Sequence, residues 1–363
     1  MRLGVLDVGS NTVHLLVVDA RRGGHPTPMS STKASLRLAE AIDDSGKLTR
    51  RGADKLIGTL DEFARIATSS GCAELMAFAT SAVRDAKNSE DVLARVKAET
   101  GVELKVLAGV DESRLTFLAV RRWYGWSAGR ITNIDIGGGS LELSSGVDEE
   151  PDVALSLPLG AGRMTREWLP DDPPGRRRVG MLRDWLSNEL ADAAAEITDA
   201  GSPDLAVATS KTFRSLARLT GAAPSGAGPR VKRTLTATGL RQLINFISRM
   251  TAADRAELEG VSVDRAPQIV AGALVAEASM KALGIESVDI CPWALREGLI
   301  LRKLDSEADG SAFVGGAGNG TSGISTKTSG SGKSGKGAGA DKTGRSGGGE
   351  SAARPISVRN AGR

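Results

Sequence analysis

Short apolar segments rich in β-branched residues alternate along the chain with longer segments of helical period. Leu3 to Leu6 and Thr12 to Val18 predict two strands, and Asp7-Val8-Gly9-Ser10-Asn11 between them has the composition of a hairpin turn. A helix is predicted from Thr49, the candidate N-cap, to Ala67, because apolar side chains there recur at intervals of three and four residues.

The same alternation continues to about residue 304. Further strands are predicted at residues 73–79, 102–107, 130–136, 141–144, 205–208 and 288–291. Further helices are predicted at residues 89–100, 111–123, 174–201, 240–250, 267–283 and 295–304, with a short helix after Ser210. Strands that alternate with helices in this way are typical of α/β proteins.

One supersecondary unit occurs twice. Leu6-Asp7-Val8-Gly9-Ser10 and Ile134-Asp135-Ile136-Gly137-Gly138 both place an aspartate at the end of a strand, before a glycine turn and a returning strand. A repeated unit indicates a duplicated domain with a cleft between the halves. We therefore expect one domain at residues 1–125, a second at 126–305 and a tail at 306–363.

Charge and composition narrow the class of protein. The net charge of +3 comes from the tail, because residues 310–363 hold eight Lys or Arg and two acids, whereas residues 1–309 hold 39 basic and 42 acidic residues. The glycine-rich tail is expected to be disordered. The folded part does not resemble a nucleic-acid-binding surface.

No apolar segment approaches the ~20 residues of a membrane span or forms a signal peptide, so neither a membrane partner nor secretion is expected. Two cysteines suit a reducing cytoplasm.

The two glycine turns carry the first candidate chemistry. Successive backbone N–H groups in a glycine turn form a concave anion site, to which Ser10, Asn11 and Ser140 add polar side chains. Asp7 and Asp135 are hard oxygen ligands suited to Mg²⁺. The alternative is that each aspartate merely opens a β-turn. Neither turn is a Walker loop or a dinucleotide fingerprint, since no helix is predicted to follow directly.

Six motifs in order resemble those of the exopolyphosphatase and guanosine pentaphosphate phosphohydrolase family. The resemblance covers almost all of residues 1–304 and implies an α/β fold of two actin-like, ribonuclease-H-like domains with an interdomain cleft. The motifs are Asp7-Val8-Gly9-Ser10-Asn11, Ala79-Thr80-Ser81-Ala82-Val83-Arg84, Asp111-Glu112-Ser113-Arg114-Leu115, Asp135-Ile136-Gly137-Gly138-Gly139-Ser140-Leu141-Glu142, Leu157-Pro158-Leu159-Gly160 and Arg296-Glu297-Gly298-Leu299.

The resemblance also implies roles for individual residues. Glu112 would be the catalytic carboxylate that activates water, although an acid in the first turn of a helix also complements the helix dipole and Asp111 could compete for the role. Glu142 would help to hold the metal with Asp7 and Asp135, unless it is a solvent-facing strand residue. The phosphate-binding residues would be Gly9, Ser10, Asn11, Arg84, Gly137, Gly138, Gly139, Ser140 and Lys211.

Several other cationic residues have two interpretations. Arg163 could contact a more distal phosphate. The Arg121-Arg122 pair and the run Arg176-Arg177-Arg178 could extend a cationic track, but a solvated surface is the favoured interpretation of each. Lys211 departs from the small residue that family members often carry there, which leaves the preferred substrate length open.

These observations lead to one principal function and two alternatives. The principal function is release of orthophosphate from the end of inorganic polyphosphate, with a preference for short chains. The alternatives are guanosine pentaphosphate 5′-phosphohydrolase and an actin-like ATP-binding protein. Mg²⁺ is the expected cofactor, with Mn²⁺ as a substitute and a monovalent cation as a further candidate. A homodimer is plausible from the apolar helix at 267–283, which an internal core would explain equally well.

Overall fold

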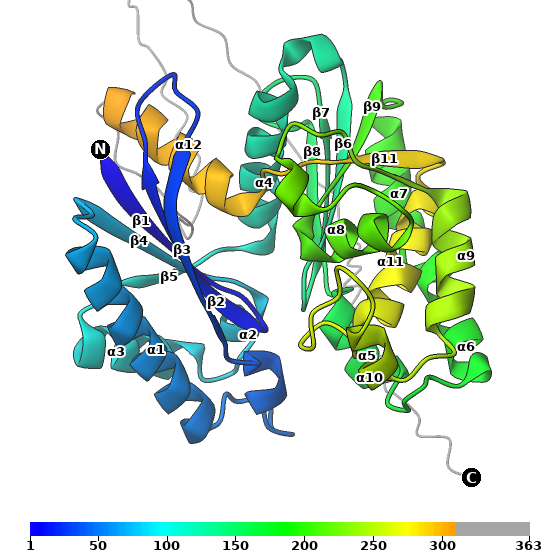
Figure 1. Ribbon diagram of the computed structural model, residues 1–363, viewed down its shortest axis with the longest axis horizontal. Helices are drawn as coiled ribbons and strands as arrows, with labels where there is room; N and C mark the ends of the chain where they lie inside the picture. The colour runs from blue at the N-terminus through cyan, green and yellow to red at the C-terminus, as the bar shows by residue number, and fades with distance from the viewer. Residues whose placement is uncertain (310–363) are drawn as a thin grey trace, which may run out of the picture. The chain divides into compact units, whose positions relative to one another are not determined.

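Two β-sheets with the same strand order organise the chain (Figure 1). The computed structural model describes residues 1–309, all of which belong to one contact unit. The predicted tail at 306–363 therefore lies almost wholly outside the described residues. Its first residues, 306–309, belong to helix α12 (Leu295–Asp309), so the helix predicted at 295–304 continues beyond its predicted end.

The first sheet is built around the predicted hairpin. Strands β1, β2 and β3 are antiparallel neighbours, whereas β4 and β5 run parallel to β1, in the order β3-β2-β1-β4-β5. The strand bounds are β1 (Arg2–Val8), β2 (Thr12–Asp19), β3 (Thr27–Ser35), β4 (Glu74–Ala79) and β5 (Leu104–Val106).

The second sheet repeats this arrangement and adds one strand at its edge. Its order is β10-β11-β9-β6-β7-β8, in which β6, β7 and β8 are antiparallel and β9 and β11 continue parallel to β6. The bounds are β6 (Ile131–Ile136), β7 (Leu141–Gly146), β8 (Val153–Leu157), β9 (Leu205–Thr209), β10 (Thr234–Thr236) and β11 (Ser287–Ile290). The predicted duplication is thereby confirmed, because both hairpins occupy the same position in their sheets.

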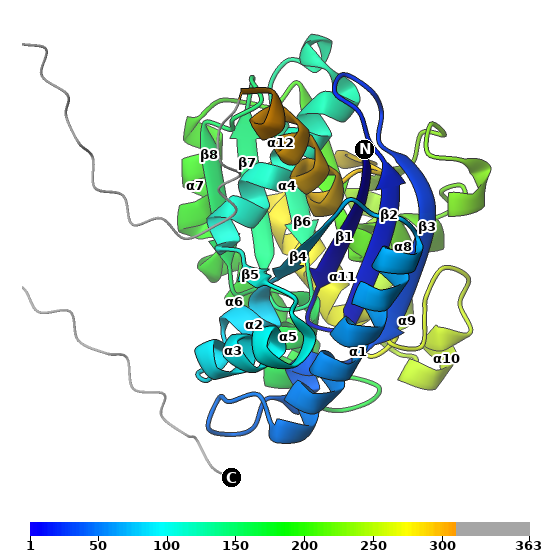
Figure 2. The same ribbon diagram turned by 90° about the vertical axis from the view of Figure 1, so that its left-hand side faces the viewer.

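Helices cover both faces of the first sheet. Side chains of β1 alternate, so that Leu6 and Val8 pack with α1 (Arg50–Ser69) and α3 (Ser89–Thr100), and Leu3 and Val5 pack with α4 (Gly109–Tyr124) and α12. Thr49 caps α1 as predicted, since its side chain accepts a hydrogen bond from the Gly52 N–H. Figure 2 shows α12 lying beside α4. The end of the described chain thus packs on the first sheet, and the predicted boundaries at 125 and 305 stay a prediction.

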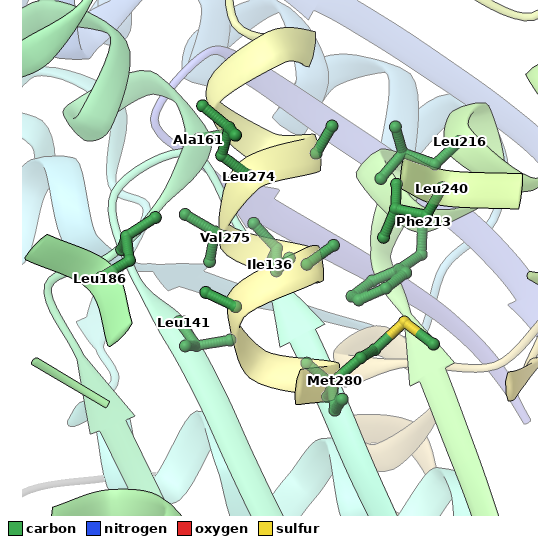
Figure 3. Packing of buried hydrophobic residues seen from close by; sticks show 14 of the residues in the cluster. Ile136, Leu141, Ala161, Leu186, Phe213, Leu216, Leu240, Leu274, Val275 and Met280 are labelled. Carbon is green, nitrogen blue, oxygen red and sulfur yellow. The ribbon is translucent and has the colours of Figure 1, made fainter. Parts of the chain in front are cut away.

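The larger core lies on the second sheet. Helix α11 (Ile269–Ala282) is buried on nearly every side and packs against Ile134 and Ile136 of β6. Figure 3 shows α11 within this cluster, with Leu274, Val275 and Met280 among its labelled side chains. The remaining helices of this half are α5 (Ala161–Trp168), α6 (Arg176–Glu189), α7 (Ala191–Asp199), α8 (Ser210–Leu219), α9 (Ala237–Ile247) and α10 (Ala252–Ala256).

Short elements complete the described chain. They are α2 (Ser81–Arg84) and the 3₁₀ helices η1 (Leu38–Ala41), η2 (Trp126–Ala128) and η3 (Ser225–Ala227). Between residues 1 and 309, no helix has the length and apolar character needed to cross a membrane.

Three strands, the helices α5 and α10, and one helix break differ from the prediction. Strands β3, β8 and β10 were not predicted, because β3 is a mostly exposed, polar edge strand, β8 is half-buried throughout and β10 is very short. The single helix expected between residues 174 and 201 is divided at Leu190 into α6 and α7. The same apolar stripe crosses the break, so periodicity could not reveal it.

Arg121 belongs neither to a cationic track nor to a solvated surface. It is fully buried at the end of α4, where its guanidinium donates hydrogen bonds to the carbonyl oxygens of Gly125, Gly129 and Gly146. Arg122 pairs with Glu149 and with Asp305 of α12. Both arginines therefore fix α4 to its surroundings.

Helix α4 packs against both sheets, and one glycine permits its close contact with α12. Phe117 and Val120 of α4 lie against Ile131 in the second sheet, whereas Leu115 packs with the first. A Cβ at Gly298 of α12 would overlap the carbonyl oxygen of Leu115. The path of α12 across α4 thus depends on the missing side chain at this position.

We expect Gly298→Ala to lower the free energy of unfolding by about 1–3 kcal/mol, because the helices must separate to admit the methyl group. Gly58→Ala is the matched control. Gly58 lies in helix α1, and a Cβ added there would meet only open space, so alanine at this position should add about 0.5–1 kcal/mol. Urea unfolding measures both. Equal stability of the two variants would contradict this account of the crossing.

Candidate active site

A cavity of about 620 Å³ lies where the two hairpin turns meet. Its lining includes the first turn through Gly9, Ser10 and Asn11, and the second through Gly137 and Gly138. Helix α4 contributes Glu112, and further residues come from the starts of α8 and α12. The cavity therefore draws on both halves of the duplicated fold.

The pleat of the strands directs both aspartates into this cavity. Asp7 continues the row of Leu3 and Val5, which faces α4 and α12, and Asp135 continues the row of Ile131, which faces α4. Because the two hairpins are equivalent, their aspartates approach the same helix from the two sheets. Asp7 and Asp135 therefore both line the one cavity.

The two glycine turns approach each other closely. The hydroxyl oxygens of Ser10 and Ser81 lie 2.9 Å apart. A Cβ at Gly138 would lie 2.9 Å from the Cβ of Ser10, and one at Gly139 would overlap Ser81. The absence of side chains in the second turn thus allows the backbones of both turns to border one space, as anion binding requires.

Glu112 is buried in the first turn of α4 and forms an ion pair with Arg84. The Nη1 atom of Arg84 lies 2.5 Å from Oε2 of Glu112. Burial raises the pKa of Glu112 to about 7, the positive charge of Arg84 opposes this rise, and Asp7 and Asp135 reinforce it. A carboxylate with this pKa can exchange a proton near neutral pH. Asp111, by contrast, is only half-buried and lies outside the cavity lining, so the structure favours Glu112.

Three further acids in the cavity, Asp7, Asp135 and Glu142, also have raised pKa values. Burial raises the pKa of Asp7, and Arg296 at the start of α12 opposes the rise. Burial and Asp7 raise the pKa of Asp135, whose Oδ2 accepts a hydrogen bond of 2.5 Å from Thr209. Burial, Glu112 and Asp135 hold the pKa of Glu142 well above its usual range.

Glu142 is not a solvent-facing strand residue. It is 5% exposed, lines the cavity and accepts a hydrogen bond of 3.0 Å from the Ser156 hydroxyl. The alternative interpretation of this residue from sequence was therefore wrong. Strand β8, which supplies Ser156, had not been predicted.

The carboxylates have the chemistry of a Mg²⁺ site but do not form a closed cage. Among residues 1–309, no three His, Cys, Asp or Glu side chains are grouped closely enough to hold a metal ion by themselves. Mg²⁺ usually binds proteins through one or two carboxylates, with water and substrate phosphate as its other ligands. The mutual repulsion of Asp7, Asp135 and Glu142 fits such an open site.

A group of cationic side chains lines the same cavity as the acids. Lys33, Lys211, Arg214 and Arg265 all line it. Burial, Arg214, Arg265 and Lys33 together lower the pKa of Lys211, which shows that these cations lie close enough to repel one another. The cavity thus places a cationic region beside the carboxylates, an arrangement suited to a phosphate chain that carries a metal ion at one end.

Most of the predicted site residues meet in this cavity. Arg84 and Gly139 are the exceptions, because neither is among the lining residues. Arg84 instead contacts Glu112, and the carbonyl of Gly139 accepts a hydrogen bond from Arg163. Arg163 also pairs with Asp85 of the first half at 2.5 Å. The predicted residues that line the cavity are Asp7, Gly9, Ser10, Asn11, Glu112, Asp135, Gly137, Gly138, Ser140, Glu142 and Lys211.

Sequence reasoning missed several residues at the cavity. Ser81 lay within a quoted motif without an assigned role, and Arg296 lay within another. Lys33, Arg214 and Arg265 follow no motif, and only folding brings them together. His14, expected to be a packed strand residue, is buried but also lines the cavity and lies 3.2 Å from Arg296. Its position opposite Asp7 in the hairpin was the one available signal.

Curated relatives match most of the chain. Exopolyphosphatase 1 of Mycobacterium tuberculosis (strain ATCC 25618 / H37Rv) is 85% identical over 314 residues, which cover 86% of this chain and 91% of the relative. Exopolyphosphatase 1 of Mycobacterium leprae is 82% identical over 314 residues, covering 86% of this chain and 93% of the relative.

Solved structures share the fold. An exopolyphosphatase from Cytophaga hutchinsonii superposes with a TM-score of 0.76 at 24% identity, covering 87% of this chain and 100% of that chain. The Ppx/GppA family member of Aquifex aeolicus superposes with a TM-score of 0.71 at 24% identity, covering 85% of this chain and 98% of that chain. The expected α/β fold of two actin-like domains with a cleft is confirmed.

The sequence model of the Ppx/GppA phosphatase family matches residues 17–307, which contain the whole cavity lining except its residues in the first hairpin. The chain belongs to the Ppx/GppA phosphatase family.

Proposed function

We propose that the protein is an exopolyphosphatase, which hydrolyses the terminal phosphoanhydride of inorganic polyphosphate and releases orthophosphate. The similarity to two mycobacterial proteins named exopolyphosphatase 1, at 82% and 85% identity, is the observation that carries the proposal. The cavity supports it, because buried carboxylates, two glycine turns and a cationic region suit a phosphate chain.

In the proposed reaction, the terminal phosphoryl group lies between the two glycine turns. Backbone N–H groups of the turns bind its oxygens, and Glu112 orients a water molecule and accepts its proton. The water oxygen forms a bond to the terminal phosphorus while the bridging P–O bond breaks, which leaves the chain one phosphate shorter. Asp7, Asp135 and Glu142 would hold Mg²⁺, which when bound supplies neutralisation of the phosphate charge.

Arg84 links substrate binding to the pKa of Glu112. Its guanidinium is paired with Glu112 and lies outside the cavity lining. A phosphate oxygen is a strong competing partner for a guanidinium. Arg84 would therefore release Glu112 as it binds phosphate, and the loss of this positive charge would make Glu112 a stronger base when substrate is present.

The choice among related substrates and the identity of the metal ion are also part of this proposal. Guanosine pentaphosphate is an alternative substrate, because its terminal phosphate would use the same residues. Mn²⁺ in place of Mg²⁺, activation by a monovalent cation, and a homodimer stay predictions. Side-by-side phosphate release from tripolyphosphate, long polyphosphate, guanosine pentaphosphate and ATP ranks the alternatives, and a preference for ATP would overturn the proposal.

We expect Glu112→Gln to reduce phosphate release from polyphosphate by at least about 10²-fold, since the amide cannot accept the water proton. Asp111→Asn is the matched control, as its side chain is the neighbouring acid outside the cavity lining and should leave kcat within about twofold. Phosphate release measured at saturating polyphosphate gives both values. Near-normal turnover by Glu112→Gln, or an equal loss in both variants, would refute the role assigned to Glu112.

Arg84→Gln should move the acid limb of the kcat/KM profile to higher pH. Glu112 works as a base only when ionised, so activity rises as pH passes its pKa, and removal of the opposing cation raises that pKa further. Arg95→Gln removes another ion-paired arginine of the first half and serves as the control. Profiles at one fixed Mg²⁺ concentration test this, and an unmoved or lowered acid limb for Arg84→Gln counts against it.

Asp135→Asn should weaken the stabilisation that Mg²⁺ gives to the folded protein. In the wild type the ion relieves repulsion among buried acids, so added Mg²⁺ should raise Tm. Without Mg²⁺, the variant should unfold at the same or a higher temperature at neutral pH, because a carboxylate whose folded pKa is raised costs stability once it ionises. Asp192→Asn, on the exposed face of α7, is the control. An undiminished Mg²⁺ shift would remove Asp135 from the metal site.

A further inference from the structure

Neutral polar side chains lie directly behind two carboxylates of the candidate active site. In β6, Asn133 precedes Asp135 by two residues. In β7, Ser144 follows Glu142 by two residues. Residues two apart in a strand point to the same face, and the strand register places Asn133 directly opposite Ser144. This pair therefore faces α4 one step behind the two acids.

Helix α4 adds a third member to this group. Thr116 lies one helical turn after Glu112, lines the cavity and is 3% exposed. Each of the three elements thus places a neutral polar residue one step behind a carboxylate. We call Thr116, Asn133 and Ser144 the polar layer.

Apolar side chains close the polar layer on its inner side. Ile131 precedes Asn133 in the same row of β6. It packs with Phe117 and Val120 of α4. A Cβ at Gly146, the next residue in the corresponding row of β7, would lie 3.3 Å from the Phe117 ring. The polar layer is therefore enclosed between the carboxylates and a hydrophobic cluster.

The polar atoms of two members are buried without a protein partner. Asn133 is 1% exposed and Ser144 is 0% exposed. Among residues 1–309, no group forms a hydrogen bond with Oδ1 or Nδ2 of Asn133 or with Oγ of Ser144. Buried polar groups are nearly always hydrogen-bonded, because their lost hydration is otherwise uncompensated. The polar layer therefore points to a small polar ligand.

We propose that the polar layer binds internal water, which bridges Asn133 and Ser144 to the carboxylates in front of them. Two residues along a strand span about 6.6 Å, and one water joins polar atoms about 5.6 Å apart through two hydrogen bonds. The spacing therefore suits a single bridging water. This water would hold both carboxylates in one orientation, which makes Asn133 and Ser144 positioning residues.

Water suits this layer better than a cation does. Asn133 presents a donor, its NH₂ group, and an acceptor, its carbonyl oxygen, and neither has a partner within residues 1–309. A cation would bind only the oxygen, whereas water can accept from the NH₂ group and donate to the oxygen. Buried waters typically make about three hydrogen bonds to such groups. The chemistry of Asn133 therefore selects water.

Two deletions of a hydroxyl group test whether members of the layer share a water. Ser144→Ala and Thr116→Val each remove one hydroxyl, and no direct hydrogen bond joins the two side chains, since Oγ of Ser144 has no partner in the described part of the chain. We expect each variant to lower Tm by about 2–4 °C, the effect of one lost net hydrogen bond. The double variant should lower Tm by less than the sum, because both deletions remove the same water.

Ser279→Ala is the matched control. The Ser279 hydroxyl is also buried without a partner among residues 1–309, but it lies in α11 and outside the cavity lining. Its change in Tm should add to that of Thr116→Val, because distant sites act independently.

A crystal structure of the full chain gives the direct readout. It should show water within about 3.2 Å of the Asn133 amide and of the Ser144 hydroxyl. A direct hydrogen bond between these two side chains without water, or a bound cation in place of water, would overturn the inference. So would additive Tm changes of Ser144→Ala and Thr116→Val.

The positioning role has a readout in catalysis, and this part rests on the proposed function. Ser144→Ala should raise the Mg²⁺ concentration for half-maximal phosphate release about three- to tenfold, the range expected for one lost net hydrogen bond, with a smaller effect on kcat at saturating Mg²⁺. Ser279→Ala should leave both values within about twofold. A merely structural role of Ser144 would lower Tm without changing the Mg²⁺ dependence, and that outcome would overturn the positioning role.

Failure of this inference is distinguishable from failure of the proposed function. The Tm measurements and the crystal structure do not depend on turnover. A wild-type protein that releases no phosphate from any polyphosphate would overturn the proposed function and leave both of these tests decisive. An active wild-type protein with additive Tm changes would overturn the water site alone.

Discussion

Mutual repulsion among four carboxylates that line one cavity is the constraint on which the rest of this structure depends. Asp7, Glu112, Asp135 and Glu142 line one cavity, and burial raises the pKa of each. Such a cluster costs stability when its members ionise, and hydrophobic packing elsewhere must offset that cost. A ligand that brings positive charge removes the repulsion. The same unfavourable arrangement that weakens the free protein therefore provides the affinity for a metal-bearing phosphate chain.

The duplicated fold explains how the acids come together. Each sheet supplies a hairpin that ends in an aspartate and a glycine turn, and α4 lies against both sheets with Glu112 in its first turn. Buried Arg121 fixes the far end of α4, and the glycine at position 298 lets α12 lie close beside it. Catalytic geometry thus follows from the packing of one helix between two equivalent sheets.

The sequence predicted those features that depend on residues close together in the chain. The alternation of β1 and β6, the glycine turns and the Thr49 cap are local signals, and they predicted the hairpins, the duplication and the aspartate pair. Features set by tertiary contacts were not predicted. Strand β3 is polar because it is an exposed edge, and Arg121 resembles a surface residue until three backbone carbonyls surround it. The cations Lys33, Lys211 and Arg265 are far apart in sequence, so only the fold identifies them as one group.

The central claim is that water, oriented by Glu112, attacks the terminal phosphorus of the chain. Hydrolysis of tripolyphosphate in water enriched in a heavy oxygen isotope, followed by mass spectrometry of both products, tests it most directly. The account predicts that the heavy oxygen enters the released orthophosphate, because the bond from water forms at the terminal phosphorus and the bridging oxygen stays with the shortened chain. Heavy oxygen in the remaining pyrophosphate, with unlabelled orthophosphate, would place the attack at the neighbouring phosphorus and contradict the account.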